Sequence, residues 1–305
     1  MGEDWTPADP TTSGSVSPEH WYRADLGIYQ TVGGSAASSD GDPVGQWQDQ
    51  ATSGDHVASA NNDYRPTLQT NELNGQSVLR FDGTNDCFAG AFTNGGALSQ
   101  PFTAFLVAKS TDTSVTRCII NGDDPSNEMA VFHHAVENKW GMWAGGFLVD
   151  GAPNTDWQLW TVLFNSTSSQ FWHGGISKVS GNAGTQNPDG IAIGSNSGGT
   201  TEYWKGDIAE IIIYNANLSD ADKDEVGNYL SDRYGISYTD IVPGAPNAVA
   251  YQTMVEVAHI PDQRMVASQV LLEVAWGPPP NILLSQFLLE VGFVRSGRKY
   301  KAQFI

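Results

Sequence analysis

The chain has 305 residues, and its 15 Lys and Arg against 34 Asp and Glu give a formal net charge of −19. A chain this acidic is unsuited to general binding of nucleic acid, because contact with backbone phosphates needs clustered cations. Only 16% of the residues are charged, whereas 33 glycines and 10 tryptophans are present. Few charges with many turn formers and aromatic residues favour an all-β protein, and the length suffices for a sizeable core without disulfides.

The first 17 residues are rich in Pro, Ser, Thr and Gly, and we expect them to form an N-terminal arm. They contain no apolar segment typical of a secretory signal. No apolar run in the sequence approaches the roughly 18 residues of a membrane-spanning helix, so we expect no contact with a membrane. The two cysteines, Cys87 and Cys118, are expected to be buried and reduced, with one bridge between them as the alternative.

Residues 18–240 contain short apolar runs separated by clusters of Gly, Asn, Asp and Ser, as in the strands of a β-sandwich. The run over 157–164 is apolar on both alternating faces, so this strand is expected to lie deep between layers. The clearest predicted strands are 78–81, 102–109, 129–133, 157–164, 191–193 and 207–214.

One helix is predicted near the end of this segment. Ser219 suits the N-cap, and Asp222 stands three residues later in a capping-box position. Gly235 suits the left-handed residue that ends a helix. Apolar residues recur at helical spacing between these signals, so the helix is expected to pack against the sandwich.

Five segments of this region carry a family resemblance, namely 21–25, 44–49, 65–68, 73–83 and 206–214. Their order and spacing resemble the laminin-G-like, concanavalin A-like jelly roll of bacterial surface proteins and phage virion proteins. The resemblance covers residues 18–240 and implies two packed antiparallel sheets with one C-terminal helix. It implies an adhesive or structural role, although the fold alone does not choose between them.

Residues 241–305 form a second predicted module with an internal repeat. A Gln-x-x-x-Glu-Val pattern occurs three times, and its glutamates, Glu256, Glu273 and Glu290, recur every 17 residues. A strand plus a turn fits this period. Antiparallel pairing would place Gln286 opposite Glu273 and Gln269 opposite Glu290, which avoids like-charge pairs.

One face of these repeats is strongly apolar, and three strands cannot bury it alone. We therefore expect a homo-oligomer formed through this face, with packing on the sandwich of the same chain as the alternative. The repeat resembles the C-terminal repeats of phage structural proteins, which implies a tailed-phage virion protein, a trimer, with other virion proteins as partners and the virion as its location. The expected oligomerisation residues are Val270, Leu272, Val274, Phe287, Leu289, Val291 and Phe293.

Carbohydrate binding is the alternative function, that of an adhesin recognising host surface glycans. Lectin sites stack sugars on exposed aromatic rings. Trp140, Trp143 and Trp172 lie in segments flanked by Gly and Asn, near His133, and are the candidate residues. Each of these aromatic residues has ordinary core packing as its alternative role.

Calcium is the one cofactor that the resemblance implies, because laminin-G-like relatives can carry it on loop carboxylates. Asp123 and Asp124 lie in an oxygen-rich loop, 121–127, that offers several ligands. A plain turn explains the same composition, since Asp and Asn are favoured in turns.

We expect no enzymatic activity. Glycoside hydrolases place two carboxylates about 5–9 Å apart across the sugar bond. The nearest pair on a predicted strand is Asp207 and Glu210, and their spacing of three is expected to place them on opposite faces. Their expected roles are a turn at the strand end and a solvated or hydrogen-bonded edge. The sequence contains neither Gly-x-Ser-x-Gly nor His-Glu-x-x-His. The leading hypothesis is a non-enzymatic virion structural protein.

Overall fold

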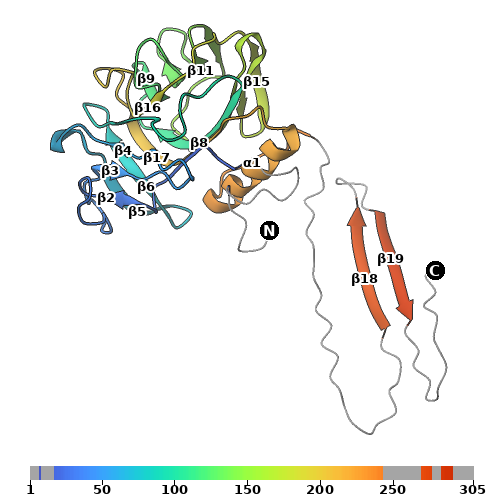
Figure 1. The fold of residues 1–305 in the computed structure, drawn as a ribbon. Coiled ribbons are helices and arrows are strands. Elements are labelled where there is room, and N and C mark those ends of the chain that lie inside the picture. Colours follow the sequence, from blue (N-terminus) through green and yellow to red (C-terminus); the bar gives the residue numbers. More distant parts are fainter. Residues whose placement is uncertain (1–6, 8–16, 243–268, 277–282, 291–305) are drawn as a thin grey trace. The chain divides into compact units, whose positions relative to one another are not determined.

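The computed structural model describes residue 7, residues 17–242, and the strands 269–276 and 283–290. The chain divides into two units, one ending at Val242 and one starting at Pro243. The first unit is a sandwich of two β-sheets with one α-helix (Figure 1), so the predicted all-β class is confirmed. Within the described residues, no helix has the length and apolar character needed to cross a lipid bilayer.

The first sheet has eight strands. They are β1 (His20–Arg23), β5 (Thr67–Leu73), β6 (Gln76–Asp82), β8 (Phe102–Ser110), β13 (Gln158–Phe164), β14 (Ser169–His173), β15 (Ile176–Gly181) and β17 (Lys205–Tyr214). Their order is β15–β14–β13–β8–β17–β6–β5, and β1 also pairs with β17.

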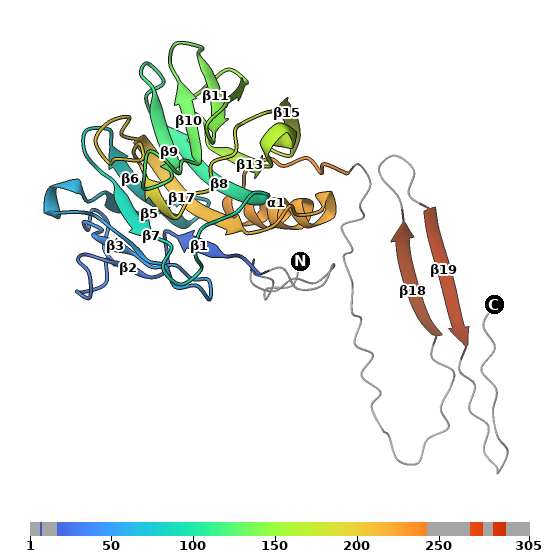
Figure 2. The ribbon, with the colours of Figure 1, turned by 45° about the horizontal axis from the view of Figure 1, so that its top comes forward.

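The second sheet has nine strands. They are β2 (Ile28–Tyr29), β3 (Gln46–Trp47), β4 (Val57–Ala58), β7 (Phe88–Ala91), β9 (Arg117–Asn121), β10 (Ala130–His134), β11 (Lys139–Trp143), β12 (Phe147–Asp150) and β16 (Gly190–Ile193). Their order is β12–β11–β10–β9–β16–β7–β4–β3–β2. Figure 2 shows β10 and β11 at the end of the sandwich away from β2 and β3. Two short 3-10 helices, Asn62–Tyr64 and Ser166–Ser168, lie in connections.

All six predicted strands are present, with ends that differ by one or two residues. Every residue of β13 is buried, as its apolar pattern predicts. Trp160, Val162 and Phe164 face the core between the sheets, whereas Leu159 belongs to a second apolar cluster on the outer side of the same sheet.

The helix α1 (Asp220–Tyr234) covers that second cluster. Ser219 and Asp222 form the predicted capping box, and Gly235 takes the left-handed conformation with φ 65°. On its buried side, Val226, Leu230 and Tyr234 pack with side chains of the eight-stranded sheet. The helix therefore closes the outer face of this sheet.

The second unit contains an antiparallel pair, β18 (Gln269–Trp276) and β19 (Leu283–Glu290). Gln269 lies opposite Glu290 and Glu273 lies opposite Gln286, so the predicted register is confirmed. The first copy of the repeat, 249–259, lies outside the described residues. So do the candidate oligomerisation residues Val291 and Phe293, whereas the other five lie on β18 and β19. The register pairs Val270 with Leu289, Leu272 with Phe287, and Val274 with Ser285.

Candidate functional site

Two of the three candidate tryptophans are buried, Trp140 in the core between the sheets and Trp172 on the outer side of the eight-stranded sheet, beneath α1. Trp140 is 1% exposed and packs against Trp160, with ring centroids 4.8 Å apart. Trp172 is 3% exposed, and the ammonium group of the buried Lys223 lies 4.7 Å from its ring centroid. Neither indole offers an open face on which a sugar could stack, because neighbouring side chains occupy those faces.

His133, the fourth candidate, is fully buried beside Trp140. Its Nδ1 lies 3.1 Å from the carbonyl oxygen of Val115. Burial lowers the pKa of His133, which favours the neutral imidazole. In this setting the histidine belongs to the core rather than to a binding surface.

Trp143 differs from the other candidates, because it lies on the outer face of the nine-stranded sheet and is partly exposed. There it joins what we call the outer aromatic cluster, formed by Phe132, His134, Trp143 and Phe147. Phe147 is at its centre: its ring centroid lies 4.7 Å from His134, 5.4 Å from Phe132 and 5.7 Å from Trp143. Phe147 is nevertheless 45% exposed.

Alternation along neighbouring strands builds this cluster. On β11, Trp140 and Met142 face the core, so Trp143 faces outward, directly opposite Phe147 on β12. Gly141 lies between Trp140 and Met142 in sequence, and its lack of a side chain leaves room for Val149 and Phe132. A Cβ atom at Gly141 would lie 2.5 Å from a methyl group of Val149 and 3.3 Å from the ring of Phe132.

Two carboxylates border the cluster. Glu128 accepts a hydrogen bond of 2.7 Å from Trp143 Nε1 and one of 2.9 Å from Ser197 Oγ. Glu202 is exposed, has φ 56°, and accepts a hydrogen bond of 3.1 Å from Cys118 Sγ. Burial, together with the charges of Glu202 and Glu128, raises the pKa of the Cys118 thiol. Both carboxylates therefore lie near one thiol, on the aromatic side of the sheet.

Cys118 packs beside Ala130 and Phe132 beneath this surface. It and Cys87 are both free and buried, as the sequence predicts. Thiol chemistry at the site is not favoured, because the raised pKa keeps Cys118 protonated.

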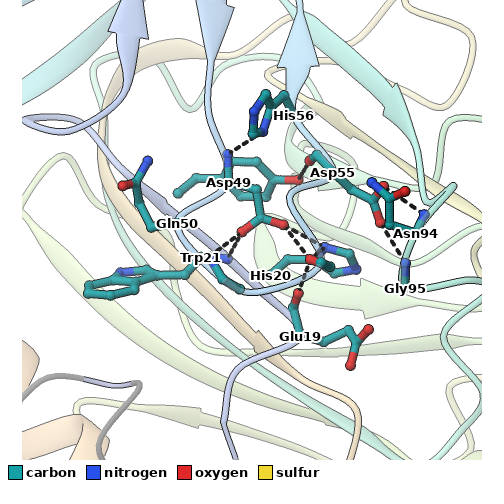
Figure 3. A network of polar contacts seen from close by, with 12 residues as sticks. Glu19, His20, Trp21, Asp49, Gln50, Asp55, His56, Asn94 and Gly95 are labelled. Atoms are coloured by element: carbon teal, nitrogen blue, oxygen red, sulfur yellow. Dashed lines mark hydrogen bonds and ion pairs between the residues drawn. The ribbon is translucent and has the colours of Figure 1, made fainter.

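A second group of polar residues combines Ser53, His20 and Asp49, of which Figure 3 labels His20 and Asp49. Asp49 accepts hydrogen bonds from Ser53 Oγ (2.7 Å) and the backbone N–H of Trp21 (2.8 Å), and its Oδ2 lies 3.0 Å from His20 Nδ1. In a catalytic triad the serine and the aspartate face different ring nitrogens. Here Ser53 Oγ lies 3.3 Å from the same Nδ1, and His20 is fully buried against Phe92. The group fastens β1 to the 49–53 loop.

The prediction that Asp207 and Glu210 lie on opposite faces of their strand is wrong. The pairing of β17 with β8 shifts between Ile208 and Glu210, which shows a β-bulge at Ala209. The extra residue changes the alternation, so both carboxylates lie on the outer side of the eight-stranded sheet, and both are buried in mid-sheet. Two guanidinium nitrogens of Arg80 bind Asp207, at 2.7 and 2.9 Å.

Glu210 holds α1 against the sheet. It accepts hydrogen bonds from Trp21 Nε1 (2.6 Å), Tyr234 OH (2.8 Å) and Tyr229 OH (3.2 Å). Burial raises the pKa of Glu210 to about 7, although the hydrogen bonds and the nearby arginines, Arg23 and Arg233, act in the opposite direction. With no path to solvent, this carboxyl group has a structural role.

Glu210 makes stability depend on pH. Its folded-state pKa of about 7 exceeds the ordinary value of 4.5, so its stabilising contribution is complete below pH 4.5 and is lost as pH rises through about 7. The shift corresponds to about 3 kcal/mol. We expect the free energy of unfolding, measured in urea, to fall more between pH 5 and pH 8 in the native chain than in Glu210→Gln, whose side chain cannot titrate. Equal losses in the two proteins would contradict this assignment.

The calcium candidates lie in a turn. Asp124 accepts a hydrogen bond of 2.6 Å from the backbone N–H of Ser126. Burial and the neighbouring charges of Asp189 and Asp124 raise the pKa of Asp123. Among the residues that the structure describes, no group of three or more His, Cys, Asp or Glu could hold a metal ion. Calcium binding at Asp123 and Asp124 stays a prediction.

No protein-family model matches this sequence, and no curated protein matches it. Among solved structures, Trypanosoma rangeli sialidase is similar at 13% identity and TM-score 0.46, covering 70% of this chain and 32% of the sialidase. The match thus spans about a third of that enzyme's length.

Two further solved structures are similar to the same extent. Domain 4 of AbnA, a GH43 extracellular arabinanase from Geobacillus stearothermophilus solved with arabinotriose, is 13% identical with TM-score 0.45, covering 64% of this chain and all of that domain. The receptor-binding domain of botulinum neurotoxin mosaic serotype C/D is 13% identical with TM-score 0.47, covering 60% and 48%. Similarities this distant carry no functional conclusion. The β-sandwich assignment comes from the two sheets of this chain.

Proposed function

We propose that the sandwich is a carbohydrate-binding module that uses the outer aromatic cluster. The observation that carries the proposal is the ring of Phe147, which is 45% exposed although three other aromatic rings surround it. Exposed rings of this kind stack on the apolar faces of sugars, and nearby carboxylates accept hydrogen bonds from sugar hydroxyls. Glu128 and Glu202 supply such acceptors beside the rings.

Trp143 is the one candidate tryptophan that keeps a role in this proposal. Among the tryptophans whose side chains the structure describes, only Trp143 and Trp157 are partly exposed. Trp157 packs against the apolar cluster under α1, and the ammonium group of Lys109 lies 5.8 Å from its ring centroid. Trp157 is therefore a matched control, a partly exposed indole away from the outer aromatic cluster.

We expect the double variant Trp143→Ala, Phe147→Ala to lose glycan affinity. Each stacked ring contributes about 0.5–1.5 kcal/mol, so the dissociation constant should rise roughly 5- to 150-fold. Glycan-array screening followed by titration calorimetry measures the change, and thermal unfolding verifies that the variant is folded. Trp157→Ala should bind as the native protein does.

Binding that survives the double change would refute the site, and a chain that binds no glycan would refute the function. Incubating the protein with the same glycans and assaying reducing ends tests the non-enzymatic role, because a hydrolase releases new reducing ends. We expect none, since the nearest carboxylate pair on one strand, Asp207 and Glu210, is buried and bound by other side chains. Release of reducing ends that Glu128→Gln or Glu202→Gln abolishes would show an enzyme instead.

We further propose that the protein is a virion structural component, displayed on a tailed phage as a trimer that its C-terminal repeats assemble. The resemblance of the sandwich segments and of the repeat to phage proteins supports this setting. The register of β18 and β19 supports the view that the repeats pair specifically with one another, because it places Gln opposite Glu at both polar positions. In this setting, glycan binding would serve attachment to a host surface.

A further inference from the structure

We infer that the outer aromatic cluster selects neutral glycans and rejects sialylated or uronic-acid glycans. This inference rests on the proposed function and names the ligand class of the same site. The carboxylates beside the rings, Glu128 and Glu202, supply hydrogen-bond acceptors. Sugar hydroxyls are donors and fit them, whereas a sugar carboxylate would meet like charge.

The positions of Glu128 and Glu202 place the repulsion of acidic sugars at the site itself. Glu128 is bonded to the indole of Trp143, so any ring that stacks there lies beside its charge. Glu202 is exposed and is held by Cys118, whose thiol pKa responds to both carboxylates. A sugar that stacks on Trp143 therefore meets the charge of Glu128, and one that extends over Phe132 toward Cys118 also approaches Glu202. In water-excluded contacts such charges are screened less than on open surface, which strengthens the repulsion.

Two bases lie at the other end of the cluster, and a third, Arg117, is buried and bound to Asp112 and to the carbonyl oxygen of Tyr203. His134 is part of the cluster, and Lys139 stands directly opposite it across the β10–β11 pair. Ala130, at the opposite end of β10, is the partner of Trp143. A sugar carboxylate could escape the two glutamates only by binding toward Lys139, away from Trp143. The native net charge of −19 adds a general repulsion of anionic ligands.

The test compares neutral and acidic oligosaccharides of matched length on the native chain. Titration calorimetry at 20 mM and 300 mM salt is expected to show neutral ligands bound with less than a twofold change in Kd between the two salt concentrations. Sialylated and uronic-acid ligands should bind at least tenfold more weakly at low salt, and the gap should narrow at high salt. Those two concentrations are experimental settings at which the Debye length differs by roughly fourfold.

Charge reversal provides the sharper comparison. Glu202→Lys is expected to raise affinity for the acidic ligands at least tenfold and to lower affinity for the neutral ligands, because it replaces an acceptor of sugar hydroxyls with a cation. Asp232→Lys makes the same change in net charge at an exposed position on α1 and should alter neither ligand class. An equal effect of the two variants would show that only net charge matters and would overturn the local assignment.

The outcomes separate this inference from the function it rests on. Preferential binding of acidic glycans that Lys139→Ala abolishes would overturn the ligand class while leaving the carbohydrate-binding role intact. Failure of every neutral and acidic glycan to bind would instead remove the proposed function itself. Neutral binding that is lost in Trp143→Ala, with acidic glycans admitted only by Glu202→Lys, would establish both.

Discussion

Replacing Asp49 with Ala is expected to destabilise the sandwich by about 3–5 kcal/mol, because it removes the acceptor from a buried hydrogen-bonded group. Asp49 receives hydrogen bonds from Ser53 and from the backbone of Trp21 and Ala51, and it faces the buried His20. The backbone N–H groups of Trp21 and Ala51 would lose this acceptor, whereas Ser53 would keep its hydrogen bond to the carbonyl oxygen of Glu19. Urea unfolding at neutral pH measures the loss as a lower midpoint at constant slope.

Asp42 provides the control for this experiment. Its carboxylate accepts two backbone hydrogen bonds, both of 2.9 Å, from Ser38 and Ser39, but the residue is partly exposed to solvent, whereas Asp49 is buried. Asp42→Ala should lower the free energy of unfolding much less than Asp49→Ala does, since water replaces the lost acceptor. Similar losses for the two variants would mean that burial of the Asp49 group is not what makes it important.

The second large effect concerns assembly. We expect Leu272→Gln with Leu289→Gln to convert the oligomer into monomers, because both positions belong to the apolar face of the repeat. Burying each such side chain contributes about 1.5–3 kcal/mol. Native mass spectrometry measures the oligomeric state, and circular dichroism verifies that the sandwich, which ends near Val242, remains folded. Removal of residues 244–305 should give the same monomer.

The matched control changes the other leucine pair of the same two strands. Leu271 and Leu288 lie directly opposite each other, on the face that also carries the Gln and Glu pairs. Leu271→Gln with Leu288→Gln should leave the oligomer assembled. A monomeric native chain, or dissociation by both double variants alike, would remove the assignment of assembly to the apolar face.

Most of the sandwich could be predicted because its signals are local. Apolar runs gave the position of strands such as β8 and β17, and a capping box with a terminal glycine gave both ends of α1. The register of β18 and β19 followed from charge, since only one pairing sets Gln opposite Glu twice. Each of these features depends on residues close in sequence or on a simple pairing rule.

The site was harder to predict because exposure depends on distant neighbours. Trp140 and Trp172 are flanked by glycine or polar residues, yet Trp160 and Lys223 cover them from other parts of the chain. Phe147 was missed, although its place at the start of a short strand just after two glycines was a usable signal. The bulge at Ala209 could not be foreseen, because it reflects how β17 fits β8 and not its own sequence.

The position of β17 has a consequence for synthesis on the ribosome. It is the last strand of the sandwich in the chain, yet it lies between β8 and β6 and also pairs with β1, nearly 190 residues earlier. Until residues 205–214 have emerged, the eight-stranded sheet consists of three separate parts, β5–β6, β8–β13–β14–β15 and the single strand β1, whose unpaired edges invite wrong pairing. The sandwich thus closes in one late step, as its final strand is released, and the repeat strands emerge from the ribosome only after that step.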